Sequence, residues 1–138
     1  MMNKSIARKG ALLFGVVYVI VGLAGFAVTG FDDWLVNTNE VLIIFEVNAF
    51  HNVVHLALGA LFLAAYAVPD ESVAQGINAG IGFFLILAAV IGFAGTGALQ
   101  LISINSAVAA DNFLHLFGGI AAVILGFQRL TTATTAPA

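Results

Sequence analysis

The chain has 138 residues, of which 62% are hydrophobic and only 8% are charged. A soluble domain has about 45–50% apolar and about 25% charged residues, so the composition excludes a soluble globular domain and a disordered chain. Four basic residues against seven acidic ones offer no cationic surface for nucleic acid, and the lack of cysteine excludes disulfides, thiolate metal sites and a cysteine nucleophile. The remaining class is an integral membrane protein.

Four long apolar stretches predict four membrane-spanning helices. A helix needs about 20 apolar residues to cross the hydrocarbon core of a bilayer. Such stretches occupy residues 7–29, 47–68, 74–95 and 107–128. Backbone groups in lipid must form hydrogen bonds within their own segment, so we expect helices. The predicted fold is all-α, an integral membrane four-helix bundle forming a single domain over residues 1–138, with a disordered cytoplasmic tail at residues 129–138.

The basic residues predict the orientation of this bundle. Lys4, Arg8 and Lys9 precede the first span, and Arg129 follows the last one. Cytoplasmic segments are enriched in Lys and Arg, and an even number of spans places both termini on one side. We therefore expect both termini in the cytoplasm and the two longer connections on the outside.

Two segments allow more than one interpretation. The first span has a basic flank and small residues at Ala24 and Ala27, as in a secretory signal, but its apolar run is longer than a signal core. Residues 41–45 are apolar and follow Thr38, Asn39 and Glu40, which suit a helix start. We expect this segment either to extend the second helix outward or to form a short interfacial helix.

The two halves of the sequence resemble each other. Residues 25–30 have the sequence GFAVTG and residues 92–97 the sequence GFAGTG, while the pattern N-x-x-H-L-x-x-G occurs at residues 52–59 and 112–119. Shared Asn, His and Thr in one order favour a tandem duplication of a helical hairpin. The halves would be related by a pseudo-two-fold axis along the membrane normal, unlike the inverted repeats of many transporters. The two repeats cover about residues 7–68 and 74–128.

All three histidines lie within predicted helices. His51 and His55 are four residues apart, as are Asp111 and His115, so each pair shares a helix face. Ionisable residues in a membrane helix are costly, usually face the interior, and indicate a function. These four side chains predict a divalent metal site, with zinc favoured and iron or copper as alternatives. Three asparagines would orient the ligand side chains by hydrogen bonds without binding the metal themselves, namely Asn48, Asn52 and Asn112.

Other interpretations use the same residues. One places heme between the second and fourth helices, with His55 and His115 as axial ligands. Another is purely structural, because Asn and His side chains can hydrogen-bond across membrane helices. In that case Asp111 caps the fourth helix. Glu46, at the start of the second helix, is expected to be solvated at the membrane surface.

The sequence thus predicts a small four-span membrane protein of uncharacterised role, with a polar His/Asn/Asp cluster near the outer leaflet. The alternatives are a metal-binding or heme-binding protein, a small transporter, and an accessory subunit of a larger membrane complex. The chain contains no nucleotide loop, Ser-His-Asp order or paired-carboxylate motif, which favours a non-enzymatic role. Expected partners are the lipid bilayer and either a second copy of the chain or a larger membrane complex, with no nucleic acid.

Two motifs support a resemblance to a known family. The motif N-x-F-H-N-x-x-H-L-x-x-G covers residues 48–59, and D-N-x-L-H-L covers residues 111–116. With these motifs the chain resembles, from about residue 7 to residue 127, the bacterial family called domain of unknown function 4383. The resemblance implies a small four-span protein of the bacterial cell membrane, broadly similar in shape to the DoxX-like group. It implies no activity and no catalytic residues.

Overall fold

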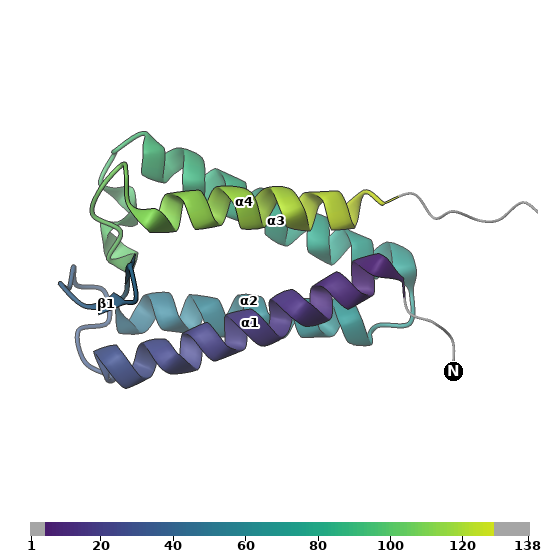
Figure 1. Cartoon of the computed structure of the whole chain (residues 1–138), viewed down its shortest axis with the longest axis horizontal. Helices are drawn as coiled ribbons and strands as arrows, with labels where there is room; N and C mark the ends of the chain where they lie inside the picture. The colour runs from purple at the N-terminus through teal and green to yellow at the C-terminus, as the bar shows by residue number, and fades with distance from the viewer. Residues whose placement is uncertain (1–4, 129–138) are drawn as a thin grey trace, which may run out of the picture.

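The computed structural model describes residues 5–128 and contains four α-helices in this part of the chain (Figure 1). They are α1 (Ile6–Thr29), α2 (Ala49–Ala67), α3 (Glu71–Phe93) and α4 (Ala110–Gly126). The predicted all-α four-helix fold is therefore confirmed, and each helix lies within a few residues of its expected span. The predicted tail at residues 129–138, which includes Arg129, lies outside the described residues.

The helices form two antiparallel hairpins, α1 with α2 and α3 with α4 (Figure 1). Packing is closest within each hairpin, and between the two hairpins α2 with α3 is the largest contact, followed by α1 with α3 and with α4. The start of α1, the end of α4 and the turn between α2 and α3 lie at one end of the molecule. The two longer connections lie together at the opposite end, which we call the loop end.

Polar caps define where three of the helices begin. Ser5, Asn48 and Asp70 precede α1, α2 and α3, and each side chain accepts a hydrogen bond from a backbone N–H in the first turn. Such caps satisfy donors that have no partner within the helix. The Asp70 carboxylate starts α3 at Glu71, earlier than the predicted residue 74.

The segment at residues 41–45 is not helical, so the prediction of a helical extension or an interfacial helix is wrong. Strands β1 (Val41–Leu42) and β2 (Phe45–Glu46) pair as an antiparallel hairpin. Ile43, at its tip, has φ 64°, a left-handed conformation that is rare for a β-branched residue. Branched and aromatic side chains favour strands, and the Val47 N–H donates to the Glu40 carbonyl at 3.0 Å, which closes the hairpin instead of a helical turn.

Large apolar side chains cover the outside of the helices. Leu13, Leu23, Phe83 and Ile124 are each more than half exposed. Contiguous apolar surface is costly in water. By length and composition, α1, α2 and α3 are able to cross a membrane, and α4 is a shorter apolar helix of 17 residues. These helices fit a small membrane protein.

Glycines allow the two helices of each hairpin to approach closely. A Cβ atom at Gly15 would lie 2.8 Å from the Leu63 side chain, and one at Gly82 would lie 2.7 Å from Val123. At the loop end, a Cβ at Gly25 would overlap the amide of Asn52. A Cβ at Gly92 would overlap the amide of Asn112 in the same way. The Gly–Asn contact thus occurs in both hairpins, while the duplication itself stays a prediction.

Candidate functional site

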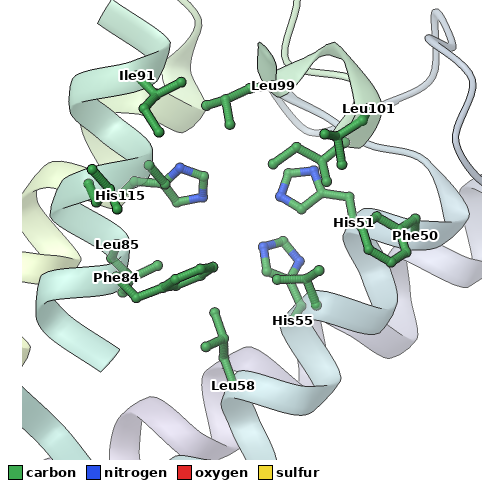
Figure 2. Close-up of a pocket in the computed structure, with 14 residues that line it drawn as sticks. Phe50, His51, His55, Leu58, Phe84, Leu85, Ile91, Leu99, Leu101 and His115 are labelled. Atoms are coloured by element: carbon green, nitrogen blue, oxygen red, sulfur yellow. The ribbon is translucent and has the colours of Figure 1, made fainter. Parts of the chain in front are cut away.

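The structure brings the three histidines together at the loop end of the bundle. His51 and His55 lie one turn apart on α2, and His115 faces them from α4 (Figure 2). Their side chains are 1%, 6% and 6% exposed, so all three are buried. Each offers a ring nitrogen that lies within 4.8 Å of the corresponding atoms of the other two. Together, these rings are called the histidine cluster below.

Two residues just before α2, Asn48 and Glu46, orient His51. The Asn48 side chain accepts a hydrogen bond from the His51 backbone N–H at 2.8 Å, which fixes the first turn of the helix. The His51 Nδ1 atom lies 3.0 Å from the Glu46 carbonyl oxygen in β2. Because a carbonyl can only accept, Nδ1 donates the proton, and in the neutral ring the lone pair lies on Nε2.

One nitrogen of each ring is buried without a hydrogen-bond partner among residues 5–128. These atoms are His51 Nε2, His55 Nδ1 and His115 Nδ1. The rings themselves are packed, with centroids 4.4 Å apart for His51 and His55 and 6.1 Å apart for His51 and His115. Buried polar atoms in folded proteins nearly always have a partner, so each of the three rings keeps a buried nitrogen that the described residues do not use.

The histidine cluster lines a cavity of about 270 Å³. Its other walls are apolar and come from α2, α3 and the short 3₁₀ helix η1 (Ala98–Ile102) (Figure 2). Phe84 and Leu87 of α3 line the cavity and are 52% and 57% exposed on the outer surface of the bundle. The cavity therefore opens sideways between the helices, on the surface that would face lipid. We call it the lateral cavity.

Asp111 does not join the group that the three histidines form. Its carboxylate is 2% exposed, and Oδ2 accepts a hydrogen bond from the Glu46 backbone N–H at 3.1 Å. The expected N-cap role is not observed, because the cap residue of α4 is Ala109. The Glu46 side chain accepts a hydrogen bond from the Asn105 backbone N–H at 2.6 Å. Asp111 thus holds the strand whose Glu46 carbonyl orients His51.

The three asparagines bind backbone groups and one threonine. Asn48 Nδ2 donates to the carbonyls of Val36 and Leu101 at 3.0 and 2.9 Å, which joins the two loops. Asn52 Nδ2 donates to Thr29 Oγ1 at 2.9 Å. Asn112 Nδ2 donates to the carbonyls of Ser106 and Ala107 at 3.0 and 3.2 Å. The nearest link from an asparagine to the histidine cluster is the Asn48 cap on the backbone of His51.

Sequence reasoning missed the part of the site that comes from outside α2 and α4. Phe84, Leu85 and Ile91 of α3, and Leu99 of η1, line the lateral cavity. Ordinary apolar residues carry no signal of such a role. Sequence reasoning also missed that the Glu46 carbonyl binds the His51 ring, because every residue type has the same backbone carbonyl.

The chain was compared with known protein families, curated proteins and solved structures. The family model described as "Domain of unknown function (DUF4383)" matches residues 8–128. No curated protein and no solved structure matches the chain. The match covers both helical hairpins and the whole histidine cluster.

Proposed function

We propose that this chain, which belongs to the family described as a domain of unknown function (DUF4383), is a small membrane protein that binds one divalent transition-metal ion through its histidine cluster. One observation carries the proposal. Three buried imidazoles converge, and each has a ring nitrogen without a partner among the described residues. A metal ion between the rings would take one nitrogen from each of the three histidines.

The chemistry of the donor set favours zinc, with iron and copper as alternatives. Neutral imidazole is a common ligand for all three metals. His51 has one feature typical of a metal ligand, since one of its ring nitrogens donates to a backbone carbonyl. Three protein ligands leave a fourth position of a tetrahedral zinc ion open, as in zinc sites that bind a further ligand.

The cluster is slightly wider than a filled site would be. Zinc–nitrogen bonds of about 2.1 Å place ligand atoms about 3.4 Å apart in a tetrahedron. The candidate ligand atoms lie within 4.8 Å of one another, so modest rotations of the side chains would close the site around an ion.

A single ion fits the arrangement better than the other interpretations. A heme between His55 and His115 would have to pass beside His51, whose ring centroid is 4.4 Å from that of His55. Purely structural hydrogen bonding between the helices would pair the ring nitrogens with protein atoms. Instead, His55 Nδ1 and His115 Nδ1 are unpaired within residues 5–128.

We also propose that all four helices cross a bacterial cell membrane with both termini in the cytoplasm. At about 1.5 Å per residue, α4 is about 25 Å long, at the lower end of the range for a membrane span. Arg8 and Lys9 lie at the end of the molecule where α1 begins and α4 ends. Cytoplasmic flanks are rich in such residues. In this orientation the histidine cluster lies toward the outer leaflet.

Metal analysis of purified protein tests the proposed metal site. The protein is extracted in mild detergent, stripped with a chelator, loaded with zinc and dialysed, and its zinc content is measured by elemental analysis. We expect about one zinc per chain, and a rise in the unfolding temperature on loading because the ion binds only the folded state. His55→Ala combined with His115→Ala should abolish both effects.

Two control variants sharpen this test. Asn78→Ala removes a fully buried polar side chain that is not part of the lateral cavity, so it should reduce stability without loss of zinc. Asp111→Asn retains an oxygen that can accept from Glu46 and should also keep zinc, whereas a site that includes the Asp111 carboxylate would lose it.

Substoichiometric zinc in the folded parent protein would refute the metal site, and a Soret band would select heme. Co-purification of a larger complex, a second copy or a transported solute would support the accessory or transporter alternatives.

A further inference from the structure

The lateral cavity is apolar apart from the histidine cluster. Val54 and Leu58 of α2 and Leu85 of α3 form its walls beside the rings. Its volume of about 270 Å³ has room for several water molecules. Such walls offer hydrogen bonds to few of these waters. The shape and chemistry suit a hydrocarbon group that arrives from the membrane.

A divalent ion at the histidine cluster would carry an unbalanced charge. The three ligands are neutral imidazoles, and no carboxylate of the described residues, that of Asp111 included, is part of the group. A charge in an apolar environment is costly unless an opposite charge accompanies it. The open fourth position of the metal therefore favours an anionic ligand with an oxygen donor.

From these two features we propose that the lateral cavity takes a long-chain carboxylic acid, whose carboxylate completes the coordination of the metal ion. The proposal rests on the proposed metal site. The carboxylate supplies the missing negative charge and an oxygen ligand. The first methylene groups fill the cavity between α2 and α3, and the rest of the chain extends through the lateral opening into the bilayer.

The position of the opening supports this ligand rather than a water-soluble anion. Phe84 and Leu87 at the opening lie on the lipid-facing surface of α3. Leu99 and Leu101 of η1 line the cavity on the side of the loop end (Figure 2). A small hydrophilic carboxylate such as acetate gains nothing from these walls, while each buried methylene group adds to binding.

Cobalt-loaded protein provides a direct test. Cobalt(II) replaces zinc at such sites, and its visible absorption changes when the fourth ligand changes. We titrate the protein in detergent micelles with dodecanoate, acetate and dodecanol. Dodecanoate should change the spectrum at a concentration at least about tenfold below that of acetate. Dodecanol, which partitions into micelles but has no carboxylate, should leave the spectrum unchanged.

A matched pair of variants separates cavity binding from partitioning into the micelle. Ala88→Phe adds an aromatic ring to the lateral cavity and replaces none of the three histidines, whereas Ala27→Phe makes the same change at an exposed position of α1. Ala88→Phe should bind cobalt normally but require at least about tenfold more dodecanoate. Ala27→Phe should behave like the parent protein.

Each opposite result has a distinct meaning. Normal cobalt binding with no response to dodecanoate, or with equal responses to dodecanoate and acetate, overturns the carboxylic-acid proposal and leaves the metal site standing. An unchanged response in Ala88→Phe overturns it as well, because the chain would then bind elsewhere. Folded parent protein that binds no cobalt or zinc overturns both the metal site and its ligand.

Discussion

At the scale of single residues, polar side chains in this apolar chain have separate tasks. His51, His55 and His115 converge, whereas Asn52 and Asn112 pack against a facing glycine in their own hairpin. The Oδ1 atoms of both asparagines are buried without a conventional donor among the described residues. Each points at a glycine backbone, where a Cα–H group can act as a weak donor. The repeated Asn and Gly of the sequence therefore form a helix contact, next to the site but not part of it.

The Gly25–Asn52 contact leads to a prediction about stability. Gly25→Ala would place a methyl group where the Asn52 amide lies, and Asn52 is fully buried and bonded to Thr29. We expect a loss of about 1–3 kcal/mol in the free energy of unfolding, typical of overpacking. Unfolding in mixed micelles with increasing denaturing detergent measures this change.

Two comparisons test the cause of that loss. Gly80→Ala, where a Cβ atom meets nothing within 4 Å, should be neutral or stabilise by up to about 1 kcal/mol. In an Asn52→Ala background, Gly25→Ala should cost much less than in the parent, because the overlapping amide is absent. Equal costs in both backgrounds would mean that the Asn52 amide is not the obstacle.

At the scale of secondary-structure elements, short segments position the long helices. Strand β2 links Asp111 on α4 to His51 on α2. The Glu46 backbone N–H donates to the Asp111 carboxylate, and the Glu46 carbonyl accepts from the His51 ring. At the other end, Arg8 on α1 donates to the Tyr66 carbonyl at 3.0 and 3.2 Å, at the carboxyl end of α2. Ser5 donates to Glu71 at 2.6 Å and so joins α1 to α3.

The Arg8 contact predicts a specific role for one of two adjacent cations. A guanidinium group at a helix carboxyl end satisfies free carbonyls and opposes the negative end of the helix dipole. Arg8→Met keeps much of the side-chain stem and should lower the free energy of unfolding by about 1 kcal/mol. Lys9→Met removes the same charge from an exposed position and should change it by much less. Similar losses in both variants would assign the effect to net charge rather than to the Tyr66 contact.

At the scale of the whole molecule, the histidine cluster joins two hairpins that otherwise touch less closely. His51 and His55 belong to the first hairpin and His115 to the second. An ion held by all three would link α2 to α4 across the interface between the hairpins. Metal binding would therefore stabilise the arrangement of the whole bundle in addition to the site itself.

The arrangement of the whole chain also predicts its topology in the membrane. A reporter fused after Gln128 should be active only as a cytoplasmic protein, and one inserted at Asp33 only outside the cytoplasm. The reason is that the basic residues at the start of α1 favour the cytoplasm, while Asp33 lies at the loop end. The reverse pattern would contradict the proposed orientation, and reporters on the same side of the membrane would contradict the number of spans.

Much of the fold was predictable, because apolar stretches of span length allow few alternatives to helices. The three histidines were also predictable as a group, from their spacing on one face of α2 and from the matching motif in α4. The role of Asp111 was not predictable. Its i,i+4 spacing with His115 gives no information about β2, whose Glu46 N–H donates a hydrogen bond to the Asp111 carboxylate. The strands at residues 41–46 were not predictable either, because the cap residues before them favour a helix locally, against the preference of branched side chains for strands.

By itself, the sequence determined the apolar character of the chain, the approximate extent of its helices and the identity of its few polar residues. These properties follow from composition and from the lengths of apolar runs, which act locally. Only the tertiary structure decided that three imidazoles meet, that Asp111 bonds to Glu46, and that α3 and η1 enclose an apolar cavity beside the rings. Such contacts depend on how two hairpins pack, and residues far apart in the chain meet there through shapes that residue types alone do not specify.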